Sequence, residues 1–70
     1  MKFWAQTPAN VYEARLQAGY DQQEIGDACG IHRDDIARAE DGTEPMHGSD
    51  WRRMLDKCEE RVRKFKADAS

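Results

Sequence analysis

The sequence predicts a single all-α domain of four to five helices, closed by a long amphipathic C-terminal helix. Helix-capping residues and glycines recur at intervals that suit short helices, whereas no β-branched run alternates polar and apolar residues with a period of two. The last third of the chain carries apolar residues at steps of three and four, the spacing of one helix face. Residues 1–70 provide one small core and so form one expected domain. Phe3 and Trp4, which precede the first helix, are expected to fold back onto this core.

The first predicted helix begins at Thr7-Pro8 and ends at Gly19. A threonine side chain can cap a helix start, proline suits the first turn, and glycine adopts the left-handed conformation that closes a helix. The residues that share its inward face at i, i+3 and i+4 spacing are Val11, Ala14 and Arg15. The aliphatic stem of Arg15 is expected to lie along the core while its charged head stays in water.

The segment Asp21-Gln22-Gln23-Glu24 has the form of a capping box and predicts a short second helix, which Gly30 ends. The expected apolar face of this helix consists of Ile25, Ala28 and Cys29. Gly26 lies inside the helix, where glycine costs about 1 kcal/mol relative to alanine. The close approach of another helix is the simplest reason for a glycine at this position.

A third helix is predicted from His32, at the capping position, to about Glu40, with Gly42 as its stop. Ile31 follows the turn and is expected to plug the core. The residues expected to face inward are Ile36, Ala37 and Ala39, and those expected to face outward are Arg33, Asp34 and Arg38. Two short helices joined by a glycine-containing turn of about three residues cross steeply, as in a helix-turn-helix. Residues 21–42 are its expected core.

Residues 49–67 are predicted to form the long C-terminal helix, after a loop over residues 43–48. Ser49-Asp50 provides its expected cap. Its apolar stripe consists of Trp51, Met54, Leu55, Cys58, Val62 and Phe65. The stripe is about 21 Å long at 1.5 Å per residue, which exceeds one side of a core built from the first three helices. Val62 and Phe65, at its far end, are therefore expected to meet a second copy in a homodimer.

Several residues fall at positions that mark one family of helix-turn-helix proteins: Arg15 and Gly19 in and after the first helix, Gln22 and Ile25-Gly26 in the second, Gly30 and Ile31 in the turn, and Ile36, Glu40 and Gly42 in and after the third. On these residues, segment 11–42 resembles the Cro-type phage repressor family. The resemblance covers just under half of the chain. It implies a sequence-specific transcriptional regulator of phage or prophage type that binds a double-stranded DNA operator as a homodimer.

The resemblance also implies roles for individual residues. Gln22, at the N-terminus of the second helix, would donate to a DNA phosphate, and the backbone at Thr43 would approach another. Arg33 and Arg38 would read guanine O6 and N7, and Asp34 would accept a hydrogen bond from cytosine N4.

The acidic residues of this segment depart from the family pattern. Asp34 and Asp35 stand where the family often has Ser or Thr, and Asp41 stands where it often has a basic or amide residue. In one interpretation, Asp34 reads a base while its acidic neighbours suppress non-specific binding. In the alternative, the fold serves a protein-binding inhibitor or adaptor, such as a phage anti-CRISPR or DNA-mimic protein. Asp34, Asp35, Asp41 and Glu44 would then dock on a basic surface of a host protein.

The net charge of −3 is unevenly spread along the chain. Residues 31–44 carry two basic side chains against five carboxylates, whereas residues 45–70 carry seven against five. Positive potential for a nucleic acid would therefore have to come from the C-terminal helix.

Other classes of function are disfavoured. The two adjacent aspartates of the third helix cannot point into one cleft, and no catalytic triad or glycine-rich phosphate loop occurs, so we expect no enzyme. Cys29 and His32 form a C-x-x-H pair that His47 and Cys58 could complete as a zinc site, but the second pair lacks ligand spacing. We therefore expect two reduced core cysteines, no metal and no cofactor. No apolar run approaches the ~20 residues that span a membrane, and the N-terminus lacks a signal-peptide core, which favours a cytoplasmic protein.

Overall fold

The fold consists of four helices, in the order α1 (Pro8–Ala18), α2 (Gln22–Cys29), α3 (Arg33–Asp41) and α4 (Gly48–Ala69). A computed structural model describes residues 4–69 and the side chains of residues 4–66. No strand occurs within residues 4–69, which confirms the all-α prediction. The long C-terminal helix is also confirmed.

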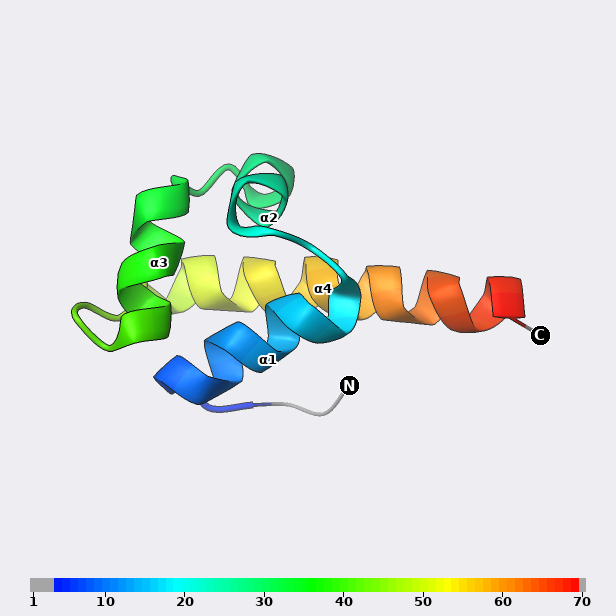
Figure 1. Cartoon of the computed structure of the whole chain (residues 1–70), viewed down its shortest axis with the longest axis horizontal. Coiled ribbons are helices and arrows are strands. Elements are labelled where there is room, and N and C mark those ends of the chain that lie inside the picture. The colour runs from blue at the N-terminus through cyan, green and yellow to red at the C-terminus, as the bar shows by residue number, and fades with distance from the viewer. Residues whose placement is uncertain (1–3, 70) are drawn as a thin grey trace.

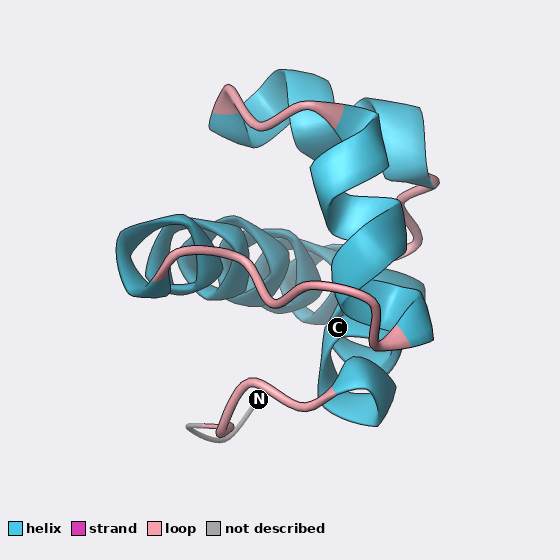
Figure 2. Ribbon diagram, turned by 90° about the vertical axis from the view of Figure 1, so that its left-hand side faces the viewer, coloured by secondary structure: helices cyan, strands magenta, loops and turns pink. Residues whose placement is uncertain are grey.

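The long helix α4 is the base on which the other elements are arranged (Figure 1). Both α1 and α2 pack on α4, and α3 packs on α1 and α2 at one end of the molecule. The C-terminal half of α4 extends beyond the other three helices, which gives a molecule of 39 × 22 × 18 Å. Figure 2, viewed from the end that carries α3, shows the loop that leads from α3 to the start of α4.

The predicted ends of α1 and α2 are confirmed. The Thr7 hydroxyl accepts a hydrogen bond from the Asn10 amide at 3.1 Å, and Gly19 closes α1 with a φ of 73°. The capping box of α2 is complete, because the Asp21 carboxylate accepts from the Glu24 amide at 2.7 Å and the Glu24 carboxylate accepts from the Asp21 amide at 3.0 Å. Local sequence therefore sets these helix ends.

Histidines stand before both of the remaining helices. His32 caps α3 as predicted, since its Nδ1 accepts from the Asp34 amide at 3.1 Å. The prediction that Ser49-Asp50 caps the C-terminal helix is wrong. Helix α4 begins at Gly48, so both residues lie inside its first turn. The His47 carbonyl instead accepts from the Asp50 and Trp51 amides, each at 3.0 Å. An imidazole nitrogen of His47 lies 3.4 Å from the Ser49 amide, in the place where a serine or aspartate oxygen was expected.

The core is a single apolar cluster shared by all four helices and the loop before α4. Its buried residues are Val11, Ala14, Ala18, Ile25, Cys29, Ile31, Ile36, Ala39, Met46, Trp51, Met54, Leu55 and Cys58. The predicted inward positions of α1, α3 and α4 fall in this cluster, apart from Arg15, Ala37 and Val62, which are partly buried, and Phe65, which is exposed. Ala28 is wrongly predicted, because it is exposed while α2 buries Ile25, Gly26 and Cys29.

The segment before α1 folds back onto the core. Trp4 packs against the buried cluster, and its carbonyl accepts a hydrogen bond from the Trp51 indole at 3.1 Å. Gln6 forms two hydrogen bonds with the backbone of Met46, at 2.6 and 2.9 Å. These contacts join the segment before α1 to the loop before α4 and to the first turn of α4. The prediction for Phe3 lies outside the described residues.

The charged head of Arg15 is buried, which corrects the prediction that it stays in water. Its guanidinium forms a two-pronged pair with the Glu40 carboxylate, at 2.7 and 2.9 Å, and donates to the Tyr20 carbonyl at 3.1 Å. Only 12% of the Arg15 side chain and 9% of the Glu40 side chain are exposed. The hydrogen bond to Glu40 raises the pKa of Arg15 above its ordinary value. The pair ties α1 to the last turn of α3.

Candidate nucleic-acid interface

A three-residue turn, Gly30 to His32, joins α2 to α3. Gly30 adopts a left-handed φ of 70°, and the Ile31 amide donates to the Gly26 carbonyl at 2.9 Å. Figure 1 shows α2 nearly along its axis and α3 from the side, so the two helices cross. This is the arrangement expected for residues 21–42.

Gly26 is required by the turn itself rather than by a crossing helix axis. A Cβ atom at this position would lie 2.6 Å from the Ile31 carbonyl oxygen and 3.4 Å from the Arg33 nitrogen. Both are backbone atoms, so neither can move aside without shifting the turn. The expected close approach is present, but its nearest partner is the turn that positions the first residue of α3.

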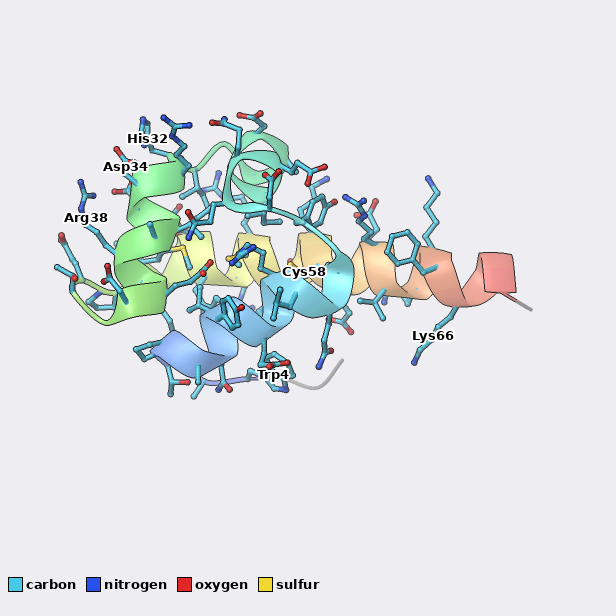
Figure 3. All side chains as sticks on the ribbon, in the orientation of Figure 1. Trp4, His32, Asp34, Arg38, Cys58 and Lys66 are labelled. Atoms are coloured by element: carbon cyan, nitrogen blue, oxygen red, sulfur yellow. The ribbon has the colours of Figure 1, made fainter. Side chains whose placement is uncertain are left out.

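The outer face of α3 is open to solvent along its length. Ile36 and Ala39 hold the helix to the core, whereas Arg33, Asp34 and Arg38 are exposed as predicted. Figure 3 shows His32, Asp34 and Arg38 along the side of α3 that points away from the rest of the molecule. A ligand can therefore reach these side chains without any change in the core.

Both arginines on this face already have a partner. Arg38 pairs with Asp35 at 2.7 Å, and Arg33 donates to the Gln23 side chain at 3.2 Å. Asp34 lies 3.6 Å from the His32 ring nitrogen. The Asp35 carboxylate accepts the hydrogen bond from Arg38 and is therefore not free. Because about half of each side chain in the Arg38–Asp35 pair is exposed, the pair contributes about 0–1 kcal/mol and is easily exchanged for another contact.

Two of the expected phosphate contacts are occupied within the chain. Gln22 is half-buried, and its side-chain amide lies 3.4 Å from the Glu40 carboxylate. The Thr43 amide donates to the Asp41 carboxylate at 3.0 Å and to the Arg38 carbonyl at 2.9 Å. The Thr43 hydroxyl also donates to Asp41, and these bonds lower the pKa of that carboxylate. Thr43 offers no free donor to a phosphate in this arrangement, and one of the two donors of the Gln22 amide is directed at Glu40.

The structure adds a hollow that the sequence did not reveal. It lies between α3 and the start of α4, holds about 180 Å³, and is lined by Asp35, Arg38, Glu44, Pro45, Met46, His47 and Asp50. The signal available in the sequence was the spacing of Asp35 and Arg38, and of Asp50 and Arg53, since both pairs are three residues apart on a helix. The hollow extends the α3 surface towards α4.

The two residues expected at a dimer interface differ in their surroundings. Val62 is half-buried and packs against the core of its own chain. Phe65 is 46% exposed, as are Tyr12 and Leu16 on α1. Packing within one chain therefore accounts for Val62, while much of the Phe65 ring remains uncovered.

The cysteines are the expected buried, free thiols. Burial raises the pKa of both, that of Cys58 to about 12. Within the described residues, no three His, Cys, Asp or Glu side chains are placed to hold a metal ion, so Cys29, His32, His47 and Cys58 do not come together as a site.

The described helices include none with the length and apolar character to cross a membrane.

Searches against protein-family models, curated proteins and solved structures found no significant match to this chain.

Proposed function

We propose that the protein is a sequence-specific DNA-binding transcriptional regulator of the phage or prophage repressor type, with α3 as the reading helix. The observation that supports this most strongly is the exposed outer face of α3, which α1 and α2 hold at one end of the molecule. A helix of nine residues is about 13.5 Å long and 10–12 Å across, and the major groove of DNA is about 12 Å wide. Such a protein needs no catalytic group or cofactor and works in the cytoplasm.

In this proposal Arg33 and Arg38 bind guanine edges and Asp34 accepts from a cytosine amine. The present partners of the two arginines, Gln23 and Asp35, are surface contacts that a base edge can replace at little cost. The nearby carboxylates of Asp34 and Asp35 repel a phosphate that comes near, whereas a base edge carries no net charge. The acidic surroundings thereby lower affinity for random DNA more than affinity for the operator.

The proposed contacts of Gln22 and Thr43 with phosphates require local exchange. Gln22 either offers the second hydrogen of its amide or leaves Glu40, and the Thr43 amide must leave the Asp41 carboxylate. The 3.4 Å separation of Gln22 from Glu40 is at the long end for a hydrogen bond, so this exchange costs little. The Thr43 contact is opposed by the charge of Asp41.

Selection of binding sites from random duplex DNA, followed by titration of the selected duplex, tests the proposal. Arg33→Ala and Arg38→Ala are each expected to weaken binding by about 1–3 kcal/mol and to relax one base preference. Arg63→Ala, on the half of α4 that lies far from α3, removes the same charge and is expected to leave the base preference unchanged. Selection of no sequence, or full binding by both α3 variants, overturns α3 as the reader.

The proposal includes a homodimer that spans two half-sites about one helical turn of DNA apart. The exposed ring of Phe65, near the end of α4, supports a contact between copies, whereas Val62 contributes mainly to its own core. Exposed Leu16 and Tyr12 extend the uncovered apolar area along α1.

A second candidate is a protein-binding inhibitor or adaptor that uses the acidic residues as a phosphate-like row. It is favoured by the exposure of Asp34 and Asp35, 62% and 54% of whose side chains are open, and by the lowered pKa of Asp41. A carboxylate row of this kind fits a basic groove on a host protein. A pull-down from host lysate, run beside the DNA selection, separates the two. Capture of one host protein by wild type but not by Asp34→Asn/Asp35→Asn, with no DNA selected, favours the inhibitor.

A further inference from the structure

An open groove lies between the C-terminal half of α4 and the corner that joins α1 to α2. It holds about 480 Å³ and is lined by Tyr20, Ala28, Lys57, Glu60, Arg61, Lys64 and Phe65. Exposed Ala28, which the sequence placed in the core, leaves room on the α2 side. We call this surface the basic groove, since it has three cations against the one carboxylate of Glu60.

The three cations of the basic groove form one row on α4. Lys57, Arg61 and Lys64 are spaced at i, i+4 and i+7, so they share a helix face and cover about 10 Å along the axis. Within the described part of the chain, no side chain forms an ion pair or hydrogen bond with any of the three. By contrast, Arg15 and Arg38 are each paired with a carboxylate.

Arg61 is held in place by two aromatic rings. Its guanidinium carbon lies 4.1 Å from the centre of the Tyr20 ring and 5.3 Å from that of Phe65. Tyr20 packs against the core, which fixes one side of this arrangement. Stacking covers the flat faces of a guanidinium and leaves its edge, with the N–H donors, for an anion. A planar fork held in this way suits the oxygens of a phosphate.

We infer that the basic groove binds the phosphodiester backbone of duplex DNA. The inference rests on the proposed function, and it supplies what the α3 surface lacks, namely cations without internal partners. Charge complementarity carries the choice of ligand, because three cations in a row, unpaired among the side chains of residues 4–66, match a strand of regularly spaced phosphates. Lys57 and Lys64 would act as point charges on either side of the Arg61 fork.

The test measures binding of a fluorescent duplex of unrelated sequence over a range of salt concentrations. Neutralising the two lysines together, in Lys57→Gln/Lys64→Gln, is expected to weaken binding and to make the slope of log K against log salt shallower by about 2. Arg61→Lys keeps the charge and loses the fork, so binding is expected to weaken with the slope unchanged. The matched control Arg63→Gln/Lys66→Gln removes two charges from exposed positions of the same helix outside the groove, and both quantities should stay near wild type.

The selected operator distinguishes failure of this inference from failure of the proposed function. If both hold, groove variants keep the base preference of wild type, while Arg33→Ala and Arg38→Ala lose it and keep the salt slope. The groove site is overturned, and α3 reading left intact, if the groove variants bind unrelated duplex as tightly as wild type. The same conclusion follows if they bind it as tightly as the control variant Arg63→Gln/Lys66→Gln. A groove-dependent slope with no selected sequence overturns α3 reading alone. If the groove prefers polyglutamate to the duplex, the phosphate site is overturned in favour of an acidic protein partner. Circular dichroism confirms that each variant is folded.

Discussion

At the scale of single residues, the Arg15–Glu40 pair is the contact that does most to place α3. It joins side chains 25 positions apart, and Gln22 adds a third group to the same carboxylate. The pair is nearly excluded from water, so either charge left alone would be both buried and uncompensated. The exposed Arg38–Asp35 pair, on the other side of the same helix, has the same chemistry without burial.

Comparison of Glu40→Gln with Asp35→Asn isolates the effect of burial. We expect Glu40→Gln to lower the free energy of unfolding by about 3 kcal/mol, because Arg15 then keeps a buried charge without its partner. Asp35→Asn breaks an exposed pair and should cost less than about 1 kcal/mol. Urea denaturation measures both. Equal costs for the two variants would show that the Arg15–Glu40 pair is as solvated as the surface pair.

At the scale of the elements, the connection between α2 and α3 depends on how closely the turn approaches α2. The Ile31 carbonyl occupies the space that a Cβ atom of residue 26 would need. Gly48, at the start of α4, has open space around it instead. An added methyl group would therefore clash at Gly26 and would fit at Gly48.

Alanine substitution at the two glycines tests this difference. Alanine has a helix propensity about 1 kcal/mol better than glycine, but overpacking costs about 1–3 kcal/mol. We expect Gly26→Ala to be destabilising, since a backbone atom lies 2.6 Å from the new methyl group. Gly48→Ala should change the free energy of unfolding by no more than about 0.5 kcal/mol. A Gly26→Ala protein more stable than wild type in urea would contradict the close approach of the turn.

The buried face of α4 makes stability depend on alkaline pH. Burial raises the pKa of Cys58 from 9.0 to about 12, so the unfolded thiol loses its proton first. The resulting stabilisation is full below about pH 9 and is lost as pH rises towards 12, by up to about 1.4 kcal/mol per pH unit. Urea midpoints measured from pH 8 to 11 should fall more steeply for wild type than for Cys58→Ala. Parallel curves would exclude a buried, protonated thiol as the cause.

The sequence predicts elements better than it predicts contacts between them. Thr7, Asp21 and Gly30 act on residues within a few positions, so helix ends could be read locally. The partner of Arg15 lies in another helix, and the sequence alone could not show that its head is buried. At the candidate interface, the exposure of Arg33, Asp34 and Arg38 followed from helix periodicity. The hydrogen bonds of Gln22 and Thr43 within the chain did not follow from periodicity, since they depend on how α2, α3 and the following loop come together.

At the scale of the whole molecule, the uneven length of the helices leaves one end of α4 without cover from the other three. Phe65 lies where this uncovered end begins, beside Gly19, and its ring is 46% exposed although it stacks on Arg61. A symmetric pair of copies would place two such ends together. The linked half-sites of a dimer would in turn raise affinity for an operator.

Phe65→Glu is expected to weaken self-association and to leave the helix-turn-helix folded, because Phe65 is absent from the buried core. Sedimentation velocity and circular dichroism measure the two quantities. Ala9→Glu, which adds the same charge at an exposed position of α1, is the control. Truncation after Glu60 is a harsher test, since it also removes Val62 from the core. A wild-type protein that sediments as a monomer at tens of micromolar would contradict the dimer.

The separation of α3 into an inner side and an open outer side has a practical consequence. Ile36, Ala39 and Glu40 hold the helix, and none of them belongs to the exposed row of Arg33, Asp34 and Arg38. The residues of the outer row can therefore be substituted together without changing the residues that hold α3 in place. If α3 reads DNA as proposed, grafting the outer residues of another reading helix onto these positions is expected to change the sequence that the protein selects, so that the chain would serve as a scaffold for programmable recognition.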